Sequence, residues 1–304
     1  MSNTQHNTPL FGLNIDPSTT NLQLAYSLAQ IADSARLDFI GIQDHPYNAN
    51  FLDTWTLLTF LGARTQHVRL MPNVLNLPLR PPAQLAKAVA SLDILTNGRL
   101  ELGLGAGGYW EGIISYGGSQ RSPGEAVSAL EEAIAIMRTL WQPTPPGQIV
   151  NFSGQHYQLV NAHPGPTPVH PIGIWLGALR PKMLRLTGQK ADGIIISSSY
   201  IPPEGVPALQ QTINVAAQAA GRDPLAIRRA YNLMGAILQP GSRPMAARRK
   251  GVIIGNAQHW IDELLRYYHD LKMDTFFFWS VMGEEEKQSH IFAEEVIPTV
   301  LEQL

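Results

Sequence analysis

The sequence predicts an α/β protein that closes into one (β/α)8 barrel, the TIM barrel, with insertions. Short runs rich in β-branched and aromatic residues alternate with longer runs of helical spacing. Several short runs, such as "FIGIQ" at 39–43, are apolar almost throughout, as strands buried on both faces of a parallel sheet are. The eight strand–helix pairs match the barrel, whereas a doubly wound open sheet normally needs about six strands.

Each predicted strand is followed by a predicted helix. Strands are expected at 10–15, 39–43, 68–75, 99–105, 171–177, 193–198, 231–238 and 275–281. Helices are expected at 20–36, 52–65, 82–95, 123–140, 181–190, 205–220, 256–272 and 285–303. Local signals support several of these limits: Asn97-Gly98 is typical of a helix end, and Pro123 suits a first helical turn.

The domain organisation follows from the same alternation. A barrel of this kind accounts for the whole length, so we expect a single domain over residues 1–304. The long stretch at 141–170 is rich in Pro and Gly. It is too long for an ordinary connector, and we interpret it as an irregular insertion between the fourth helix and the fifth strand.

Composition narrows the function classes. The formal net charge of -2 gives no general attraction to nucleic acid or to anionic membranes. The chain has no cysteine, which excludes a disulfide framework and a cysteine nucleophile. No apolar run reaches membrane-spanning length, and the polar N-terminal stretch does not resemble a signal peptide. We therefore expect a soluble cytoplasmic protein with no membrane or nucleic-acid partner.

Asp44 and His45 follow the second predicted strand directly. In a (β/α)8 barrel, functional side chains gather at the carboxyl ends of the strands. The pair could therefore serve as an acid–base or hydrogen-bonding unit that faces a ligand. Simple loop geometry, with the Asp opening a turn before Pro46, is the alternative that the dipeptide leaves open.

The stretch "LGLGAGGYW" at 102–110 contains a G-x-G-x-x-G pattern. A dinucleotide-binding fingerprint needs a helix directly after it, and "YWEGIISYGG" is a poor helix. We favour a glycine-rich strand end that lets a flat ligand approach the backbone, although a tight turn without a ligand also fits. Pro72 within the third strand run implies a bulge or bend.

Two basic stretches are candidate anion sites. In "GALRPKM" at 177–183, a strand end leads into a helix that begins near Pro181, and helix N-termini bind phosphate. The "SRPMAARRKG" loop at 242–251 could receive an anionic cofactor tail or could simply be solvated. The spacing of His156, His163 and His170 fits no metal site, so no metal is expected.

Nearly the whole chain resembles the luciferase-like family of flavin- and deazaflavin-dependent oxidoreductases, the bacterial luciferase-like monooxygenases. The matching stretches are "GIQDHPY", "LDILTNGRLELGLGAGG", "FSGQHYQL", "PIGIWLGALRPKMLRLTGQKADG" and "FAEEVIP". The family fold is a (β/α)8 barrel that holds its cofactor at the carboxyl ends of the strands.

The resemblance implies a set of cofactor-binding residues. A non-prolyl cis peptide behind the cofactor ring would fall at Asn73–Val74. The glycine strand end at Gly105, Ala106 and Gly107 would lie along the cofactor. The cofactor phosphate would be bound by Gly177, Ala178, Leu179 and Arg180.

The Asp-His pair resembles the branch of the family that uses coenzyme F420, a deazaflavin, which makes Asp44 and His45 the candidate catalytic residues. Some deazaflavin dehydrogenases carry a catalytic glutamate just after the glycines of strand 4. Gly108 holds that place here and Glu111 follows three residues later, so a sugar-phosphate dehydrogenase is not expected.

The favoured function is F420-dependent hydride transfer to or from a small organic substrate, with His45 exchanging the accompanying proton. An FMN-dependent monooxygenase of the same family and a non-catalytic flavin-binding barrel are the alternatives. The sequence does not fix the oligomeric state; the family often forms dimers, so the resemblance makes a homodimer a candidate. Aromatic candidates for the pocket wall are Tyr47, Phe51, Trp55, Tyr109, Trp110 and Trp279. The sequence does not identify the substrate.

Overall fold

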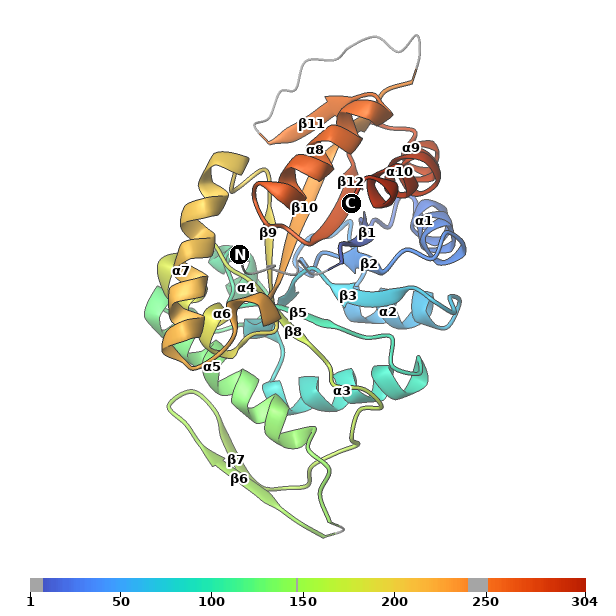
Figure 1. Cartoon of the computed structure of the whole chain (residues 1–304). Helices are drawn as coiled ribbons and strands as arrows, with labels where there is room; N and C mark the ends of the chain where they lie inside the picture. The colour runs from blue at the N-terminus through green and yellow to red at the C-terminus, as the bar shows by residue number, and fades with distance from the viewer. Residues whose placement is uncertain (1–7, 146, 240–250) are drawn as a thin grey trace.

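The computed structural model describes residues 8–145, 147–239 and 251–304. All eight expected strands are present, and they form a barrel surrounded by helices (Figure 1). The third expected strand is split into two pieces around residues 73 and 74. The barrel strands are β1 (Leu10–Ile15), β2 (Phe39–Ile42), β3 (Arg69–Pro72), β4 (Leu75–Asn76), β5 (Leu102–Gly105), β8 (Ile174–Gly177), β9 (Gly193–Ser197), β10 (Arg228–Ile237) and β12 (Thr275–Ser280).

The strands are hydrogen-bonded in the order β3-β2-β1-β12-β10-β9-β8-β5-β4, and each neighbouring pair is parallel. Because β3 and β4 follow one another in the chain, the two ends of this order meet. A parallel bridge between Leu70 and Leu100 helps to close the ring. An additional strand, β11 (Val252–Gly255), pairs with the long β10. The expected barrel is therefore confirmed.

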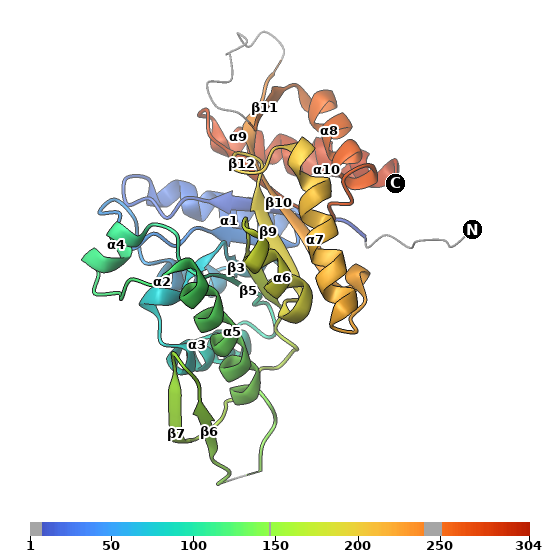
Figure 2. The same cartoon turned by 90° about the vertical axis from the view of Figure 1, so that its left-hand side faces the viewer.

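Helices cover the outside of the barrel in both views (Figures 1 and 2). They are α1 (Leu22–Ser34), α2 (Thr54–Gly62), α3 (Pro82–Leu95), α4 (Trp110–Ser115), α5 (Pro123–Leu140), α6 (Pro181–Lys190), α7 (Val206–Ala219), α8 (Ala257–His269), α9 (Glu285–Ile291) and α10 (Ile297–Glu302). Helix α5 begins with a capping box between Ser122 and Glu125, which satisfies free N–H groups of the first turn.

Two departures from the expected elements have local causes. The six-residue helix α4 follows the glycine-rich strand end, where we expected a poor helix, and Gly117 ends it with a positive φ. The expected helix at 285–303 is interrupted by a π-helical segment, Phe292–Val296. Pro298 lies just beyond this segment and has no N–H to donate to the preceding turn, so a regular ladder cannot continue through it.

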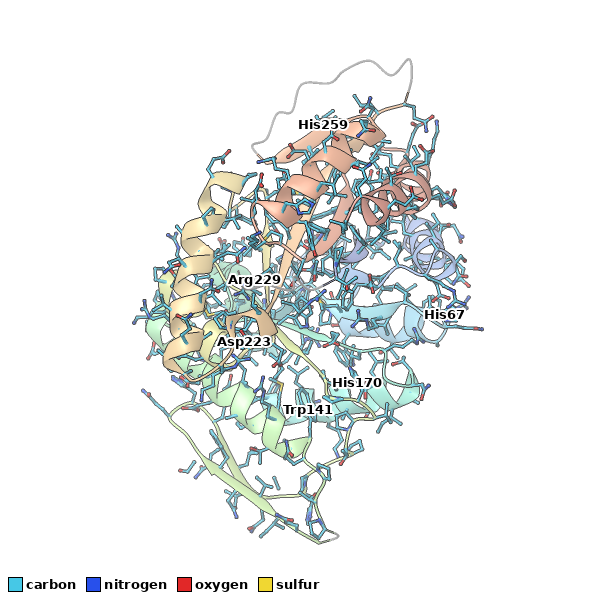
Figure 3. The ribbon with its side chains drawn as sticks, viewed as in Figure 1. His67, Trp141, His170, Asp223, Arg229 and His259 are labelled. Carbon is cyan, nitrogen blue, oxygen red and sulfur yellow. The ribbon has the colours of Figure 1, made fainter. Side chains whose placement is uncertain are left out.

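The segment at 141–170 is more regular than expected. It contains an antiparallel hairpin of β6 (Val150–Ser153) and β7 (Gln158–Ala162), which projects from the barrel (Figure 1). Trp141 and His170, both labelled in Figure 3, attach its two ends to α3. The indole of Trp141 donates to the carbonyl of Ala86 at 3.0 Å, and Nδ1 of His170 lies 2.6 Å from the carboxylate of buried Asp93.

Two apolar clusters fill the molecule. The larger one lies between the sheet and the helices. The smaller cluster takes side chains from six different strands, which identifies it as the filling of the barrel interior. Its members are Phe39, Met71, Trp175, Ile195, Ala230 and Phe277. Because the strands bury both faces, their sequences are apolar rather than alternating.

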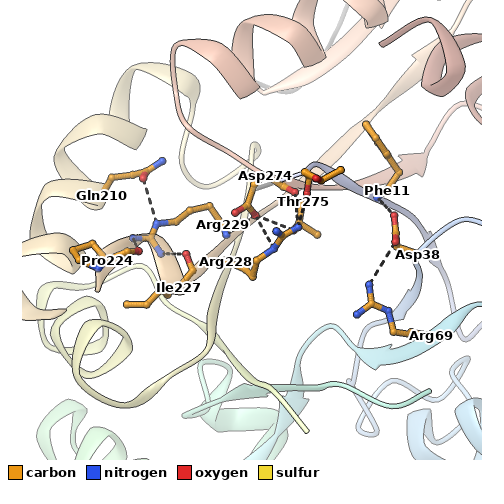
Figure 4. Close-up of polar contacts among 11 residues, drawn as sticks. Phe11, Asp38, Arg69, Gln210, Pro224, Ile227, Arg228, Arg229, Asp274 and Thr275 are labelled. Carbon is orange, nitrogen blue, oxygen red and sulfur yellow. Dashed lines mark hydrogen bonds and ion pairs between the residues drawn. The ribbon is translucent and has the colours of Figure 1, made fainter. Parts of the chain in front are cut away.

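Polar contacts close the amino end of the barrel (Figure 4). Asp38, just before β2, accepts from the backbone N–H of Phe11 and pairs with Arg69. Asp274, just before β12, accepts from the backbone N–H of Arg229 and pairs with Arg228. Burial lowers the pKa of Arg229 to about 10. A barrel of this kind places its functional site at the opposite end, where the strands have their carboxyl ends.

Candidate active site

A cavity of about 540 Å³ opens at the carboxyl ends of the barrel strands. Its lining residues come from the ends of β2, β4, β5, β8, β9 and β10 and from the loops that follow them. They are Asp44, His45, Tyr47, Asn73, Val74, Leu75, Asn76, Gly105, Ala106, Gly107, Gly108, Tyr109, Gly177, Ala178, Leu179, Ile195, Ile196, Ser197, Tyr200 and Asn232. A cavity of this size is typical of a site for a small molecule or a cofactor.

The candidate residues from the sequence converge on this cavity. Asp44, His45, Asn73, Val74, Gly105, Ala106, Gly107, Gly177, Ala178 and Leu179 all line it. Arg180 does not; it is exposed beside the rim, at the start of α6. The convergence brings together segments that lie up to 135 positions apart in the sequence, from residue 44 to residue 179.

The peptide bond between Asn73 and Val74 is cis, as the family resemblance implied. It separates β3 from β4 and follows Pro72, where we expected a bulge or bend. The side chain of Val74 lies against two glycine strand ends. A Cβ on Gly105 would lie 3.0 Å from Cγ2 of Val74, and one on Gly177 would lie 2.9 Å from the same atom. Glycine at 105 and 177 thus leaves room for Val74 in the cavity wall.

A network of amide side chains joins three sides of the barrel at the cavity. Nδ2 of Asn73 donates to Oδ1 of Asn14 at 2.9 Å and to Oδ1 of Asn232 at 2.8 Å. Nδ2 of Asn232 donates back to Oδ1 of Asn73 at 3.0 Å, and lies 3.2 Å from Oγ of Ser197. Such a connected set of donors and acceptors holds its members in one arrangement.

Sequence reasoning missed Asn14, Ser197 and Asn232. A signal for them existed, because each is a polar residue beside apolar residues of a strand. Asn14 and Ser197 lie at or near the carboxyl ends of β1 and β9, and Asn232 lies in the middle of β10. Such a residue has to find a hydrogen-bond partner in the barrel or face a ligand. The missed signal was therefore the polar exception within each strand, not a motif.

His45 stands at the rim of the cavity and is exposed. Its Nδ1 lies 2.7 Å from the hydroxyl of Tyr47, whose ring packs edge-on against that of Tyr109 with 5.2 Å between centroids. Desolvation lowers the pKa of His45, and the charge of Asp44 opposes this shift only in part. The imidazole is therefore uncharged at neutral pH and can accept a proton.

The hydrogen bond and the ion pair of Asp44 are made with residues other than His45, although the two are adjacent in the chain. Its carboxylate accepts from the backbone N–H of Asn76 at 2.8 Å and pairs with Nη2 of Arg80 at 3.2 Å. Nη2 of Arg80 lies 2.7 Å from Asp53, which caps α2. Asp44 is buried, whereas Asp53 is partly exposed. The ion pairs connect the loop after β2 to the segment after β4 and to α2.

The expected anion site adjoins the cavity. Gly177 ends β8 and α6 begins at Pro181, with no side chain capping its first turn. Arg180 and Lys182 are both exposed there. Free N–H groups, the helix dipole and two cations make this rim suitable for phosphate. The second basic stretch, 242–251, lies outside the described residues except for Gly251.

Other sequence candidates have mixed outcomes. Tyr47 and Tyr109 line the cavity, whereas Phe51, Trp55 and Trp110 do not. Glu111 is exposed and lies 3.4 Å from the hydroxyl of Tyr109, and it is not part of the cavity wall.

Within residues 8–145, 147–239 and 251–304, no group of three or more His, Cys, Asp or Glu side chains could hold a metal ion. Among the described helices, none combines the length and apolar character that crossing a bilayer requires.

Known proteins are similar to this chain in sequence or in fold. The 5,10-methylenetetrahydromethanopterin reductase of Archaeoglobus fulgidus is 28% identical over 259 residues, which are 80% of this chain and 74% of that protein. The F420-dependent glucose-6-phosphate dehydrogenase of Gordonia bronchialis is 30% identical over 211 residues, which are 66% of this chain and 61% of that protein.

A solved structure of an F420-dependent secondary alcohol dehydrogenase, in complex with an F420-acetone adduct, superimposes with a TM-score of 0.84. It is 18% identical in sequence, and the superposition covers 97% of this chain and 99% of that one. This likeness establishes the fold.

The family model for luciferase-like monooxygenases matches residues 9–274, which is most of the chain. The match spans every barrel strand except β12, which begins at Thr275. The matched region contains Asp44-His45, the cis peptide at Asn73–Val74 and both glycine strand ends. Sequence, fold and site geometry agree, and this chain is an enzyme of the luciferase-like monooxygenase family.

Proposed function

We propose that this protein is an oxidoreductase that uses coenzyme F420 for hydride transfer to or from a small organic substrate. The observation that carries the proposal is the cavity itself. It combines Val74 packed between two glycine strand ends, the uncapped start of α6 at its rim, and the imidazole of His45. The F420-dependent relatives support the deazaflavin over a flavin.

The residues present fit a flat cofactor with a phosphate. Gly105, Gly177 and Val74 give a wall without bulky projections, against which a ring system can lie. The amides of Asn73 and Asn232 and the hydroxyl of Ser197 provide polar groups for ring heteroatoms. The N-terminus of α6 would take the phosphate, with Ala178 and Leu179 beside it and Arg180 adding charge.

When bound, the deazaflavin supplies hydride chemistry at a ring carbon. The protein's part is to orient the substrate and to manage the proton. In the oxidative direction, neutral His45 takes the proton that leaves a substrate hydroxyl or amine. In the reductive direction, protonated His45 returns a proton to the product. Tyr47, 2.7 Å from Nδ1, fixes the orientation of the ring, so that Nε2 is the nitrogen left for the substrate.

We assign Asp44 a positioning role. Both of its oxygens are used, one by Arg80 and the other by the N–H of Asn76. The carboxylate thereby fixes the loop that carries His45 relative to the segment that follows the cis peptide. A homodimer, a candidate from the resemblance, and a cytoplasmic location, expected from the sequence, remain predictions, which sedimentation and cell fractionation can test.

Titration of the purified protein with oxidised F420 and, separately, with FMN tests the proposal. Absorbance and fluorescence of each cofactor report binding. We expect saturable F420 binding and at least tenfold weaker FMN binding, followed by reduction of bound F420 when a panel of alcohols and amines is added. A preference for FMN, with oxygen consumption by the reduced complex, would select the monooxygenase. Binding without turnover on any panel would favour the non-catalytic barrel.

A further inference from the structure

A second, smaller recess adjoins the cavity at His45. Its volume is about 140 Å³. Five residues line both hollows: His45, Asn73, Ser197, Tyr200 and Asn232. The recess is therefore continuous with the proposed cofactor site and lies beside the imidazole that handles the proton. Its remaining wall comes from the ends of β1, β2 and β12, which contribute no residue to the larger cavity apart from the loop after β2.

The part of the recess wall that is not shared with the larger cavity carries one carboxylate, that of Asp16. Asp16 follows β1 directly and accepts hydrogen bonds from Nε2 of Gln43 and, at 3.3 Å, from Nε1 of Trp279. All three side chains line the recess. No arginine or lysine in the described parts of the chain forms a salt bridge with Asp16. The carboxylate thus lacks a counter-charge from these residues.

The electrostatic surroundings of Asp16 favour a cation. Asp16 is exposed into the hollow, yet the surrounding walls desolvate its carboxylate and raise its pKa. The hydrogen bonds from Gln43 and Trp279 oppose this shift, and the charge of Glu285 adds to it. The two hydrogen bonds come from neutral donors, and such bonds favour the ionised form of a carboxylate. A positive charge beside it would relieve the unfavourable desolvation.

The indole ring of Trp279 is a second feature of the recess that favours a positively charged ligand. Its indole N–H is directed to Asp16, while the ring forms part of the recess wall. Cations bind favourably over the face of an indole ring. An anionic group in the same place would meet an uncompensated carboxylate at close range, which is strongly unfavourable in a partly desolvated hollow.

We propose that this recess binds the substrate through a positively charged nitrogen, with Asp16 as its counter-charge and Trp279 as its aromatic wall. This rests on the proposed function and narrows the substrate class: a small amine or the protonated imine that corresponds to it, and not a phosphate or a carboxylate. Gln43 is a positioning residue that holds the Asp16 carboxylate at the mouth of the recess.

Matched five-membered-ring probes test the charge preference: cyclopentylammonium, cyclopentanol and cyclopentanecarboxylate. Calorimetry and ligand-observed NMR would measure their binding to the full chain, with and without F420. We expect the ammonium to bind about tenfold more tightly than the alcohol, since a hydrogen bond between two charged groups is stronger than one to a neutral hydroxyl. The carboxylate should show no saturable binding. Equal affinities for the ammonium and the carboxylate in the wild-type protein would overturn the proposal.

Substitutions in the recess test which side chain causes the preference for the ammonium probe. Asp16→Asn keeps the shape and should lower the affinity for the ammonium about tenfold, to that of the alcohol. Asp270→Asn makes the same change of charge at an exposed residue that ends α8, before β12 begins, and should leave all three affinities unchanged. Trp279→Phe should retain most of the ammonium preference. If the preference survives Asp16→Asn and disappears in Trp279→Phe, the counter-charge assignment is wrong.

The same samples separate this proposal from the proposed function. F420 titration of the wild-type protein reports the larger cavity alone. Saturable F420 binding without an Asp16-dependent ammonium preference would overturn the recess assignment and leave the proposed function standing. An Asp16-dependent preference without F420 binding would support the recess and count against the cofactor. Thermal melting of each variant shows whether it is folded, and the wild-type probe series remains decisive if Asp16→Asn is not.

Discussion

The buried carboxylate of Asp44 lies 3.2 Å from Nη2 of Arg80, 36 positions away in the sequence. This pair joins the loop that carries His45 to the segment that follows the cis peptide, so two walls of the candidate site are held by one contact. Burial would ordinarily penalise both charges, and the charges of Asp44 and Asp53 hold the pKa of Arg80 above its usual value. The relationship explains why an Asp precedes the histidine without touching it.

Removing the guanidinium should be costly. Arg80→Met leaves the Asp44 carboxylate buried with only the N–H of Asn76 as a partner. We expect a loss of about 3 kcal/mol in the free energy of unfolding, because removing one partner of a buried ion pair leaves the other charge, here the Asp44 carboxylate, buried without compensation. Urea denaturation measures it. Asp53→Asn is the matched control: Asp53 is partly exposed, so its loss should cost less than about 1 kcal/mol. Equal losses in the two variants would show that Asp44 is solvated.

His45→Gln should separate catalysis from binding. We expect turnover to fall about a hundredfold or more, the range attributed to a positioned proton-transfer group, with little change in F420 affinity. Because desolvation lowers the pKa of His45, oxidation should become faster as pH rises through a value below 6.5 and then level off. Steady-state rates against pH check this. If His45→Gln retains that limb, another group handles the proton, and Tyr47→Phe would be examined next.

Gly177→Ala should narrow the cofactor cavity. The added methyl would lie 2.9 Å from Cγ2 of Val74, which has to move into the space that the ring would occupy. We expect F420 affinity to fall about tenfold and stability to drop by about 1 to 3 kcal/mol, as overpacking does. Gly205→Ala is the control, because Gly205 lies outside the cavity wall and a Cβ there would meet nothing closer than 3.4 Å. Adding Val74→Ala to Gly177→Ala should recover the stability if the contact is the cause.

The raised pKa of His170 should make the free energy of unfolding depend on pH. The carboxylates of Glu101 and Asp93 raise its pKa above 6.5 in the folded protein. The raised pKa stabilises the fold fully below the unfolded pKa. This contribution disappears as pH rises from about 6.5 through the folded value. Denaturant unfolding at a series of pH values should show the decrease in the wild-type protein and not in His170→Gln. An identical pH slope in both proteins would contradict the assignment.

The strand and helix pattern was predictable because its signals are local. Helices α3, α5 and α6 occupy the predicted ranges 82–95, 123–140 and 181–190, and each has Pro at its first helical turn. The continuous apolar runs identified buried parallel strands, and the count of eight identified the barrel. Since a barrel places every strand end at one rim, Asp44-His45 and the glycine strand ends were expected to lie near one another.

Closure of the barrel decided what the sequence left open. Asp44 pairs with Arg80 instead of His45, and Asn73 meets Asn232 from 159 positions away. Asp16 meets Trp279 across 263 positions, because β1 and β12 become neighbours only when the ring is complete. Residue type and local spacing determined which side chains reach the rim. Which of them are partnered there, and which remain free for a ligand, depends on long-range contacts that only the tertiary structure creates.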